Sequence, residues 1–180
     1  KPTEDKLEIG SILRYIGSGN TSDVLRNVCY LLYDKEDKTG WKQFVVEIES
    51  LFRIQLNPPR YIIATGLLKM TYNEGRKKNV DLSSLGSGTK QAILLFAYLL
   101  AFPNTVNLLD EPDAHLEVIR QSNIYDKISD IAKKTNSQLI VASHSESVMN
   151  RAFGKDMVIS GMFGEFKIEN QEKYIKSVMS

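Results

Sequence analysis

Residues 106–111 have the sequence Val-Asn-Leu-Leu-Asp-Glu, and residues 139–144 have the sequence Leu-Ile-Val-Ala-Ser-His. Each stretch is a short, mostly apolar run that ends in polar side chains. Between them, apolar residues recur at helical spacing, at Leu116, Ile119, Ile124, Ile128 and Ile131. A strand, a helix and a second strand in this order form a right-handed crossover with parallel strands. The sequence therefore predicts an α/β fold around a parallel sheet.

The acidic pair Asp110-Glu111 ends the first of these strands. The carboxyl ends of parallel strands face the crevice in which ligands bind. Mg²⁺ takes oxygen ligands and keeps several waters, so Asp110 is a candidate magnesium ligand beside nucleotide phosphates. Glu111 is placed to orient or deprotonate an attacking water. Taken alone, the pair also fits a solvated strand end.

His144 follows the second strand and is expected at the same edge of the sheet. Its imidazole suits a hydrogen bond to a γ-phosphate or to the attacking water, although a lone histidine is often structural or on the surface. His115 is a weaker candidate because it could simply cap or open the following helix. Nothing else supports a metal site formed by His115 and His144.

Earlier in the chain, Gly86-Ser87-Gly88 opens a helix. The free N–H groups at a helix N-terminus suit an anion, and Ser87 adds a hydroxyl donor. The alternative is a flexible loop ahead of a core helix. Residues 92–100 are apolar on nearly every face, so this helix is predicted to be buried, and Pro103 stops it.

The N-terminal third combines a helical hairpin with a small sheet. Residues 7–16 and the Gly-rich residues 17–20 suggest a lead-in segment and a loop, after which Thr21, Ser22 and Asp23 are candidate helix caps. Apolar residues at helical spacing in 24–32 and 41–52 predict two packed helices. After Pro58 and Pro59, strands are expected at 61–64, at 67–72 and near Val80, in an antiparallel arrangement. Residues 157–159 and 171–179 predict a further strand and a terminal helix.

Composition indicates the cellular compartment and the kind of surface rather than the chemistry of the site. The 23 basic and 22 acidic residues nearly cancel, which argues against a broad nucleic-acid surface, and the cluster at residues 76–78 fits a solvated surface. Cys29 is the single cysteine, which excludes an intrachain disulfide, fits a reducing compartment and suggests a buried small hydrophobe. The longest apolar run, residues 92–102, is shorter than the roughly 20 residues that span a bilayer. We expect a cytoplasmic protein without a membrane span.

Together and in this order, the motifs resemble the ABC-type ATPases of the SMC, RecF-like and OLD (overcoming lysogenization defect) families. Residues 82–91 resemble the ABC signature, 106–111 the Walker B strand, 112–115 the D-loop, and 139–144 the strand with the switch histidine. The signature departs from the common transporter form at Gly86, Ser87 and Thr89. This departure points away from transporters and leaves the register of the signature serine open.

The resemblance implies a P-loop NTPase-like parallel-sheet lobe with a helical subdomain and a small antiparallel element. It also implies a homodimer that sandwiches ATP between two heads. Glu111 and His144 would be catalytic in cis, and Asp110 would bind Mg²⁺. The residues expected to contact ATP in trans, from the signature and the D-loop, are Leu85, Gly86, Ser87, Gly88 and Asp113.

A head of this kind also needs a Walker A loop, G-x-x-x-x-G-K-[ST], and no such match occurs here. Residues 17–21 are Gly-rich but lack the lysine. Either the Walker A half was removed or it is a separate polypeptide, and the start at Lys1 without methionine favours a fragment. We expect a single domain in which residues 1–60 form the helical hairpin region and residues 61–180 form the signature, Walker B and switch-histidine lobe.

The expected function of the intact protein is ATP hydrolysis coupled to dimerisation, controlling DNA repair, recombination or antiphage defence through DNA and a nuclease or effector partner. A non-catalytic, nucleotide-sensing scaffold is the alternative, although such a module has no chemical need for Glu111. A transporter nucleotide-binding domain is a third reading and would require a membrane partner. Neither a Toprim nuclease domain nor a sustained heptad pattern is visible in the sequence.

Overall fold

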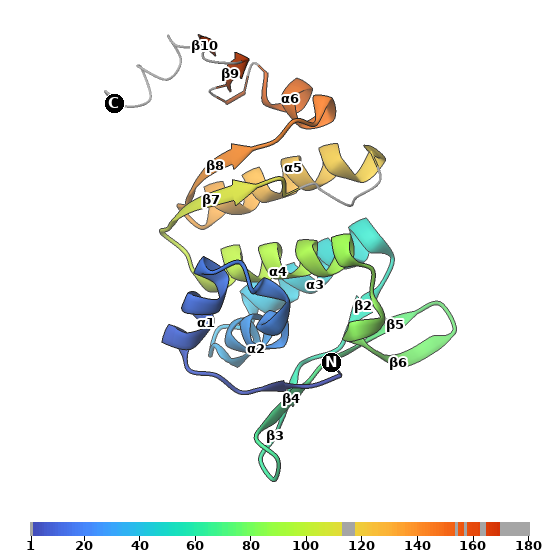
Figure 1. Ribbon diagram of the computed structural model, residues 1–180. Coiled ribbons are helices and arrows are strands. Elements are labelled where there is room, and N and C mark those ends of the chain that lie inside the picture. The colour runs from blue at the N-terminus through green and yellow to red at the C-terminus, as the bar shows by residue number, and fades with distance from the viewer. Residues whose placement is uncertain (1, 113–117, 154, 157, 163–164, 170–180) are drawn as a thin grey trace.

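The computed structural model describes residues 2–112, 118–153, 155–156, 158–162 and 165–169 (Figure 1). The chain combines helices with several short sheets, which confirms the predicted α/β class. The helices are α1 (Ile9–Gly17), α2 (Leu25–Asp34), α3 (Thr39–Phe52), α4 (Ser87–Ala101), α5 (Val118–Lys134) and α6 (Glu146–Ala152). Two short 3-10 turns, η1 (Thr21–Asp23) and η2 (Leu82–Ser84), precede α2 and α4. No helix among the described residues is long and apolar enough to cross a membrane.

The core forms where α4 packs among the other helices. Most of its apolar residues are buried, and Ile93, Phe96 and Leu99 are at 0% exposure, as its all-round apolar character predicts. The hairpin of α2 and α3 is also confirmed, and it contributes buried residues such as Val28 and Phe44 to the same core. The lysine that follows α2, Lys35, donates to the carbonyls of Leu100 and Ala101 and so caps the C-terminus of α4.

The small antiparallel element consists of two three-stranded sheets. One has the order β1 (Glu4–Asp5), β4 (Leu67–Lys69), β3 (Arg60–Ile62), and the other has the order β2 (Gln55–Leu56), β5 (Thr71–Glu74), β6 (Lys77–Asp81). The antiparallel pairing was predicted, but residues 67–72 are two strands rather than one. Met70 interrupts them because its side chain is buried and its carbonyl accepts the N–H of Leu82 instead of a strand partner.

The parallel pair is formed by β7 (Val106–Asp110) and β8 (Gln138–Ala142), in register from Val106 opposite Gln138 to Asp110 opposite Ala142. Helix α5 connects the two strands, lies beside them and also packs against α3 and α4, which lie with α1 and α2 below the strand pair in the view of Figure 1. The predicted strand, helix and parallel strand are confirmed. Beyond α6, β9 (Val158–Met162) and β10 (Glu165–Glu169) form an antiparallel pair, and β9 covers part of the strand expected at 157–159.

The N-terminal part departs from two of the expectations. Residues 9–17 form helix α1 rather than a lead-in segment. The residues expected to cap α2 form η1 instead, and the residue at the N-cap of α2 is Val24. The expected division between residues 60 and 61 falls inside β3 and stays a prediction. The terminal helix expected at residues 171–179 lies outside the described residues.

Candidate functional site

The carboxyl ends of β7 and β8 bring the predicted catalytic residues together. Asp110 and Ala142 are paired across the strands, and the N–H of Glu111 donates to the carbonyl of Ala142 at 2.8 Å. Glu111 then turns out of the strand with a φ of 48°, in the left-handed region that side chains other than glycine seldom adopt. This turn directs the Glu111 carboxylate toward the residue that follows β8 by two positions, His144.

Nδ1 of His144 lies 2.5 Å from Oε1 of Glu111. An ionised carboxylate can only accept hydrogen bonds, so Nδ1 carries the proton and Nε2 points elsewhere. The His144 side chain is 88% exposed and that of Glu111 is 34% exposed. The pair therefore presents a free imidazole nitrogen to solvent while its other nitrogen is held by a carboxylate.

Helix α6 begins directly after this pair and fixes the segment that carries His144. Ser145 is its N-cap and accepts the N–H of Val148, while Ser143 Oγ accepts the N–H of Ser145. Farther along, Tyr125 of α5 donates to Asp156 at 2.6 Å, just past α6. His144 thus lies in a short connection that is anchored on both sides.

The predicted signature residues open helix α4 as expected. Gly86 is the N-cap and has no side chain with which to occupy the first N–H groups of the helix, so these remain available to an anion. Ser87 is exposed, Gly88 is buried and Leu85 is half-buried. A Cβ added at Gly86 would meet nothing within 4 Å, so this end of the helix is open.

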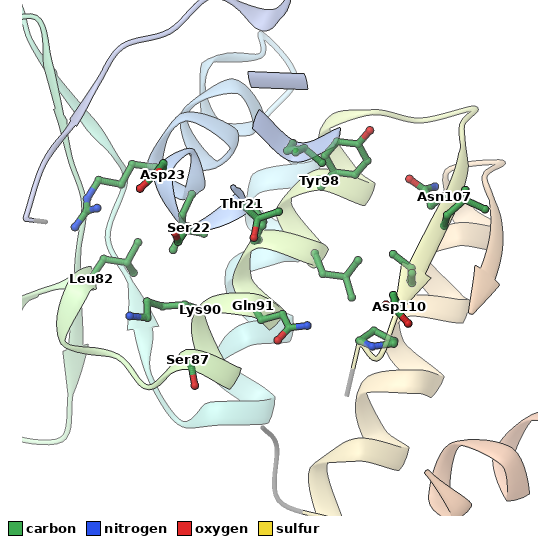
Figure 2. Close-up of a pocket in the computed structure, with 18 of the residues that line it drawn as sticks. Thr21, Ser22, Asp23, Leu82, Ser87, Lys90, Gln91, Tyr98, Asn107 and Asp110 are labelled. Atoms are coloured by element: carbon green, nitrogen blue, oxygen red, sulfur yellow. The ribbon is translucent and has the colours of Figure 1, made fainter. Parts of the chain in front are cut away.

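A groove of about 630 Å³ runs between α4 and β7, bounded also by η1. Figure 2 shows Ser87, Lys90 and Gln91 on one side of it and Asp110 on the other. Ser87 and Asp110 therefore line one groove, whereas Glu111 and His144 are not among its lining residues. The signature and Walker B stretches are neighbours within this single chain.

Gln91 was not among the predicted site residues. It lies one turn into α4, and its Nε2 donates to the main-chain carbonyl of Glu111 at 3.4 Å. This bond connects the helix that opens with the predicted signature to Glu111, whose carboxylate is the predicted catalytic one. A polar residue at the start of an otherwise apolar helix was the available sequence signal, but its partner, 20 residues away, could not be read from the sequence.

The donor set at Asp110 fits a magnesium ion that is shared with a substrate. Among the described residues, no three His, Cys, Asp or Glu side chains are placed to hold a metal together. One carboxylate at a strand end, completed by phosphate oxygens and waters, is the kind of site that Mg²⁺ occupies in nucleotide-dependent enzymes. Asp113 and His115 lie outside the described residues.

Comparisons with known proteins identify relatives of this chain. Residues 20–150 match the family described as "AAA domain, putative AbiEii toxin, Type IV TA system". The chromosome partition protein Smc of Rhodopseudomonas palustris is 37% identical over 93 residues, which cover 48% of this chain and 8% of that protein. The zinc import ATP-binding protein ZnuC of Haemophilus influenzae is 30% identical over 152 residues, 74% of this chain and 56% of ZnuC. The chain thus spans only part of the length of these relatives.

Solved structures of Smc heads share the fold. The Smc head bound to the C-winged helix domain of ScpA aligns with a TM-score of 0.58 and 21% identity, over 98% of this chain and 53% of that one. A structure described as "Structural biochemistry of ATP-driven dimerization and DNA stimulated activation of SMC ATPases" aligns with a TM-score of 0.54 and 20% identity, over 79% and 92%. The expected P-loop NTPase-like fold is confirmed. The chain therefore belongs to the AAA-domain family described as a putative AbiEii toxin of type IV toxin–antitoxin systems, and it is an ABC-like ATPase domain related to the Smc and ZnuC heads.

Proposed function

We propose that this chain is the signature-bearing half of a head that hydrolyses ATP with Glu111 and His144 and dimerises around ATP. The observation that carries the proposal is the contact between these two side chains, at 2.5 Å, beside Asp110 at the carboxyl edge of a parallel strand pair. The residues proposed to contact ATP across the dimer are Leu85, Gly86, Ser87, Gly88 and Asp113.

The geometry assigns complementary tasks to the catalytic pair. With Nδ1 donating to Glu111, Nε2 of His144 is the nitrogen that faces the reactants, and it can hydrogen-bond to a γ-phosphate oxygen or to the attacking water. The Glu111 carboxylate holds the ring in one tautomer and stabilises the positive charge when the imidazole gains a proton. Asp110 would bind Mg²⁺, which when bound neutralises phosphate charge.

The missing Walker A half is proposed to cover the open face of β7 and β8. Alternate residues of these strands are exposed, and among them Val106 is 62%, Leu108 is 76% and Ile140 is 60% exposed. An apolar face of a parallel sheet is ordinarily covered on both sides. Leu108 also lines the groove beside α4, so a helix or strand placed there would be enclosed between α4 and β7.

The proposed output is control of a DNA-directed activity in repair, recombination or antiphage defence, through DNA and a nuclease or effector partner. The relatives support this direction, since one is a chromosome partition protein and the family is described with a toxin of toxin–antitoxin systems. The ZnuC relative is a zinc import protein. The described residues contain no helix able to span a membrane.

ATP turnover by the intact protein tests the catalytic assignment. Glu111→Gln keeps the size of the side chain but removes the charge that holds His144, and we expect turnover to fall by about 10²–10⁴-fold, the usual contribution of general acid–base catalysis. Glu49→Gln, the same change at an exposed position on α3, is the matched control and should leave turnover unchanged. Equal turnover in both variants would exclude the catalytic role and favour a nucleotide-sensing scaffold.

A further inference from the structure

A buried arginine connects three parts of the chain that are distant in sequence. Arg26, in the first turn of α2, is 4% exposed. Its Nη1 donates to Glu4 Oε1 of β1 at 3.2 Å, and its Nη2 donates to Asp81 Oδ1 of β6 at 2.9 Å. One guanidinium therefore bridges two carboxylates on different sheets. The planar fork of arginine suits such bridging, which a lysine ammonium cannot reproduce.

The Glu4 end of this bridge is fixed by several hydrogen bonds. Oε2 of Glu4 accepts hydrogen bonds from the main-chain N–H groups of Arg26 and Asn27 and from Nδ2 of Asn27. Val24, the N-cap residue of α2, has no polar side chain, so Glu4 caps this helix from another element. Arg26 is consequently held on a helix terminus that is itself anchored to β1.

The Asp81 end leads directly into the signature. Asp81 ends β6, and its Oδ1 accepts both Arg26 and the N–H of Ser83 at 2.8 Å, which caps η2. Leu82 is fully buried, and its N–H donates to the carbonyl of Met70. Helix α4 begins at Ser87, a few residues later. The segment that leads into the signature therefore starts from a carboxylate whose position depends on Arg26.

We propose that Arg26 and Asp81 are positioning residues for the ABC signature. Their ion pair sets where the N-terminus of α4 is presented, and so how well this chain meets the nucleotide bound by a second head. The inference rests on the proposed function, in which the signature acts across the dimer. It adds that the ion pair controls ATP-dependent dimerisation without contributing to nucleotide binding within one head.

Asp81→Asn is the informative variant. The asparagine keeps an oxygen that can accept the N–H of Ser83, while Arg26 retains Glu4 as a charged partner, so no buried charge is left unpaired. Arg26→Lys is the second variant, because it keeps the charge but cannot bridge both carboxylates. Glu47→Gln is the control, because it removes an ion pair, between Glu47 of α3 and Lys127 of α5, that involves neither Arg26 nor Asp81.

The experiment uses the intact protein, with its Walker A half, in a Glu111→Gln background that prevents turnover. Titration with Mg-ATP below the dimerisation concentration measures binding within one head, and sedimentation with Mg-ATP measures the dimer dissociation constant. We expect Asp81→Asn and Arg26→Lys to raise that constant by about tenfold to a hundredfold, the usual effect of misplacing a binding group. Binding within one head should stay within about twofold, and Glu47→Gln should change neither quantity.

The outcomes separate this inference from the proposed function. If the background protein dimerises with ATP and both Arg26→Lys and Asp81→Asn do so equally well, the positioning role is wrong while the sandwich stands. The positioning role is also wrong if binding within one head falls in parallel with dimerisation, since that pattern reports a general structural loss. If the background protein fails to dimerise with ATP, the proposed function falls and this inference falls with it.

Discussion

Glu111 combines an unusual backbone conformation with a short hydrogen bond to His144. Its φ of 48° costs of order 1–3 kcal/mol for a residue with a side chain. The conformation is held by the bond from its N–H to Ala142 and by the donation of Gln91 to its carbonyl. The result is a carboxylate that leaves the strand direction and meets His144. Strain at this residue is therefore consistent with a functional placement.

The buried carboxyl of Glu4 predicts a pH dependence of stability. Burial raises the pKa of Glu4 above its ordinary 4.5, and the hydrogen bonds and charge supplied by Arg26 and Asn27 only partly offset this. Between 4.5 and the raised pKa, the folded state holds a proton that the unfolded state has released. The contribution of Glu4 to the free energy of unfolding therefore falls as pH rises through this window.

Urea unfolding of the parent and of Glu4→Gln, from pH 4.5 upward, checks this prediction. The variant cannot ionise at this position, so the parent should lose stability relative to the variant as pH rises. Above the raised pKa, the difference between the two should become constant. A difference that does not change with pH would show that Glu4 keeps its ordinary pKa in the folded protein, and a change in the opposite direction would show that the pKa is lowered.

Among the elements, the open N-terminus of α4 predicts that a substitution there weakens ATP-dependent dimerisation without destabilising the fold. In Gly86→Ala the backbone angles, φ −59° and ψ 156°, suit alanine, and the added Cβ meets nothing within 4 Å. We expect the free energy of unfolding to change by less than about 1 kcal/mol. The methyl group would stand where the phosphate of a second head approaches the helix, so ATP-dependent dimerisation should weaken by about tenfold or more.

Circular dichroism melts and sedimentation with Mg-ATP measure the two effects of Gly86→Ala separately. Gly10→Ala, on α1, is a matched control, because a Cβ there also meets nothing within 4 Å and the residue lies away from the signature. Unchanged dimerisation of Gly86→Ala would mean that the N-terminus of α4 does not approach the nucleotide.

Most elements could be predicted because their signal is local. The apolar runs of β7 and β8 and the all-round apolar α4 each have one plausible structure. Helix α1 was missed although Ile9, Ile12, Leu13 and Ile16 have helical spacing, because the mixture of apolar and polar positions ahead of the Gly-rich residues 17–20 suggested a lead-in segment and a loop. The start of α2 was misplaced since its cap is supplied by Glu4, more than 20 residues away, which no local rule can find.

The sequence indicated which residues could form the candidate site, but not the long-range contacts that connect its parts. Asp110, Glu111 and His144 were proposed as site residues from their positions at strand ends, and the parallel register pairs Asp110 with Ala142 at the edge where the other two follow. The Arg26 to Asp81 ion pair could not be foreseen, because 55 residues separate the partners and the chain offers many other charged pairs. Tertiary pairing of charges is set by the packing of sheets and helices rather than by spacing.

For the whole molecule, the exposed face of β7 and β8 predicts that the Walker A half covers these strands. In the intact protein we expect Leu108→Asp to lower the free energy of unfolding by about 3 kcal/mol or more, because an unpaired charge would be buried beneath the Walker A half. Ile63→Asp, at a residue that is 86% exposed between β3 and β4, is the control and should change it by less than about 0.5 kcal/mol. Equal, small effects would show that the strand face is open to water in the intact protein.

In the proposed mechanism, two heads close around ATP, with the signature of one facing the nucleotide of the other. Sedimentation of the intact protein carrying Glu111→Gln, with and without Mg-ATP, is the decisive measurement. We expect a monomer without nucleotide and a dimer with Mg-ATP, because ATP that is bound but not hydrolysed should hold the sandwich together. A sedimentation coefficient that does not respond to ATP, whether of a monomer or of a fixed oligomer, would exclude the ATP sandwich and favour the nucleotide-sensing scaffold.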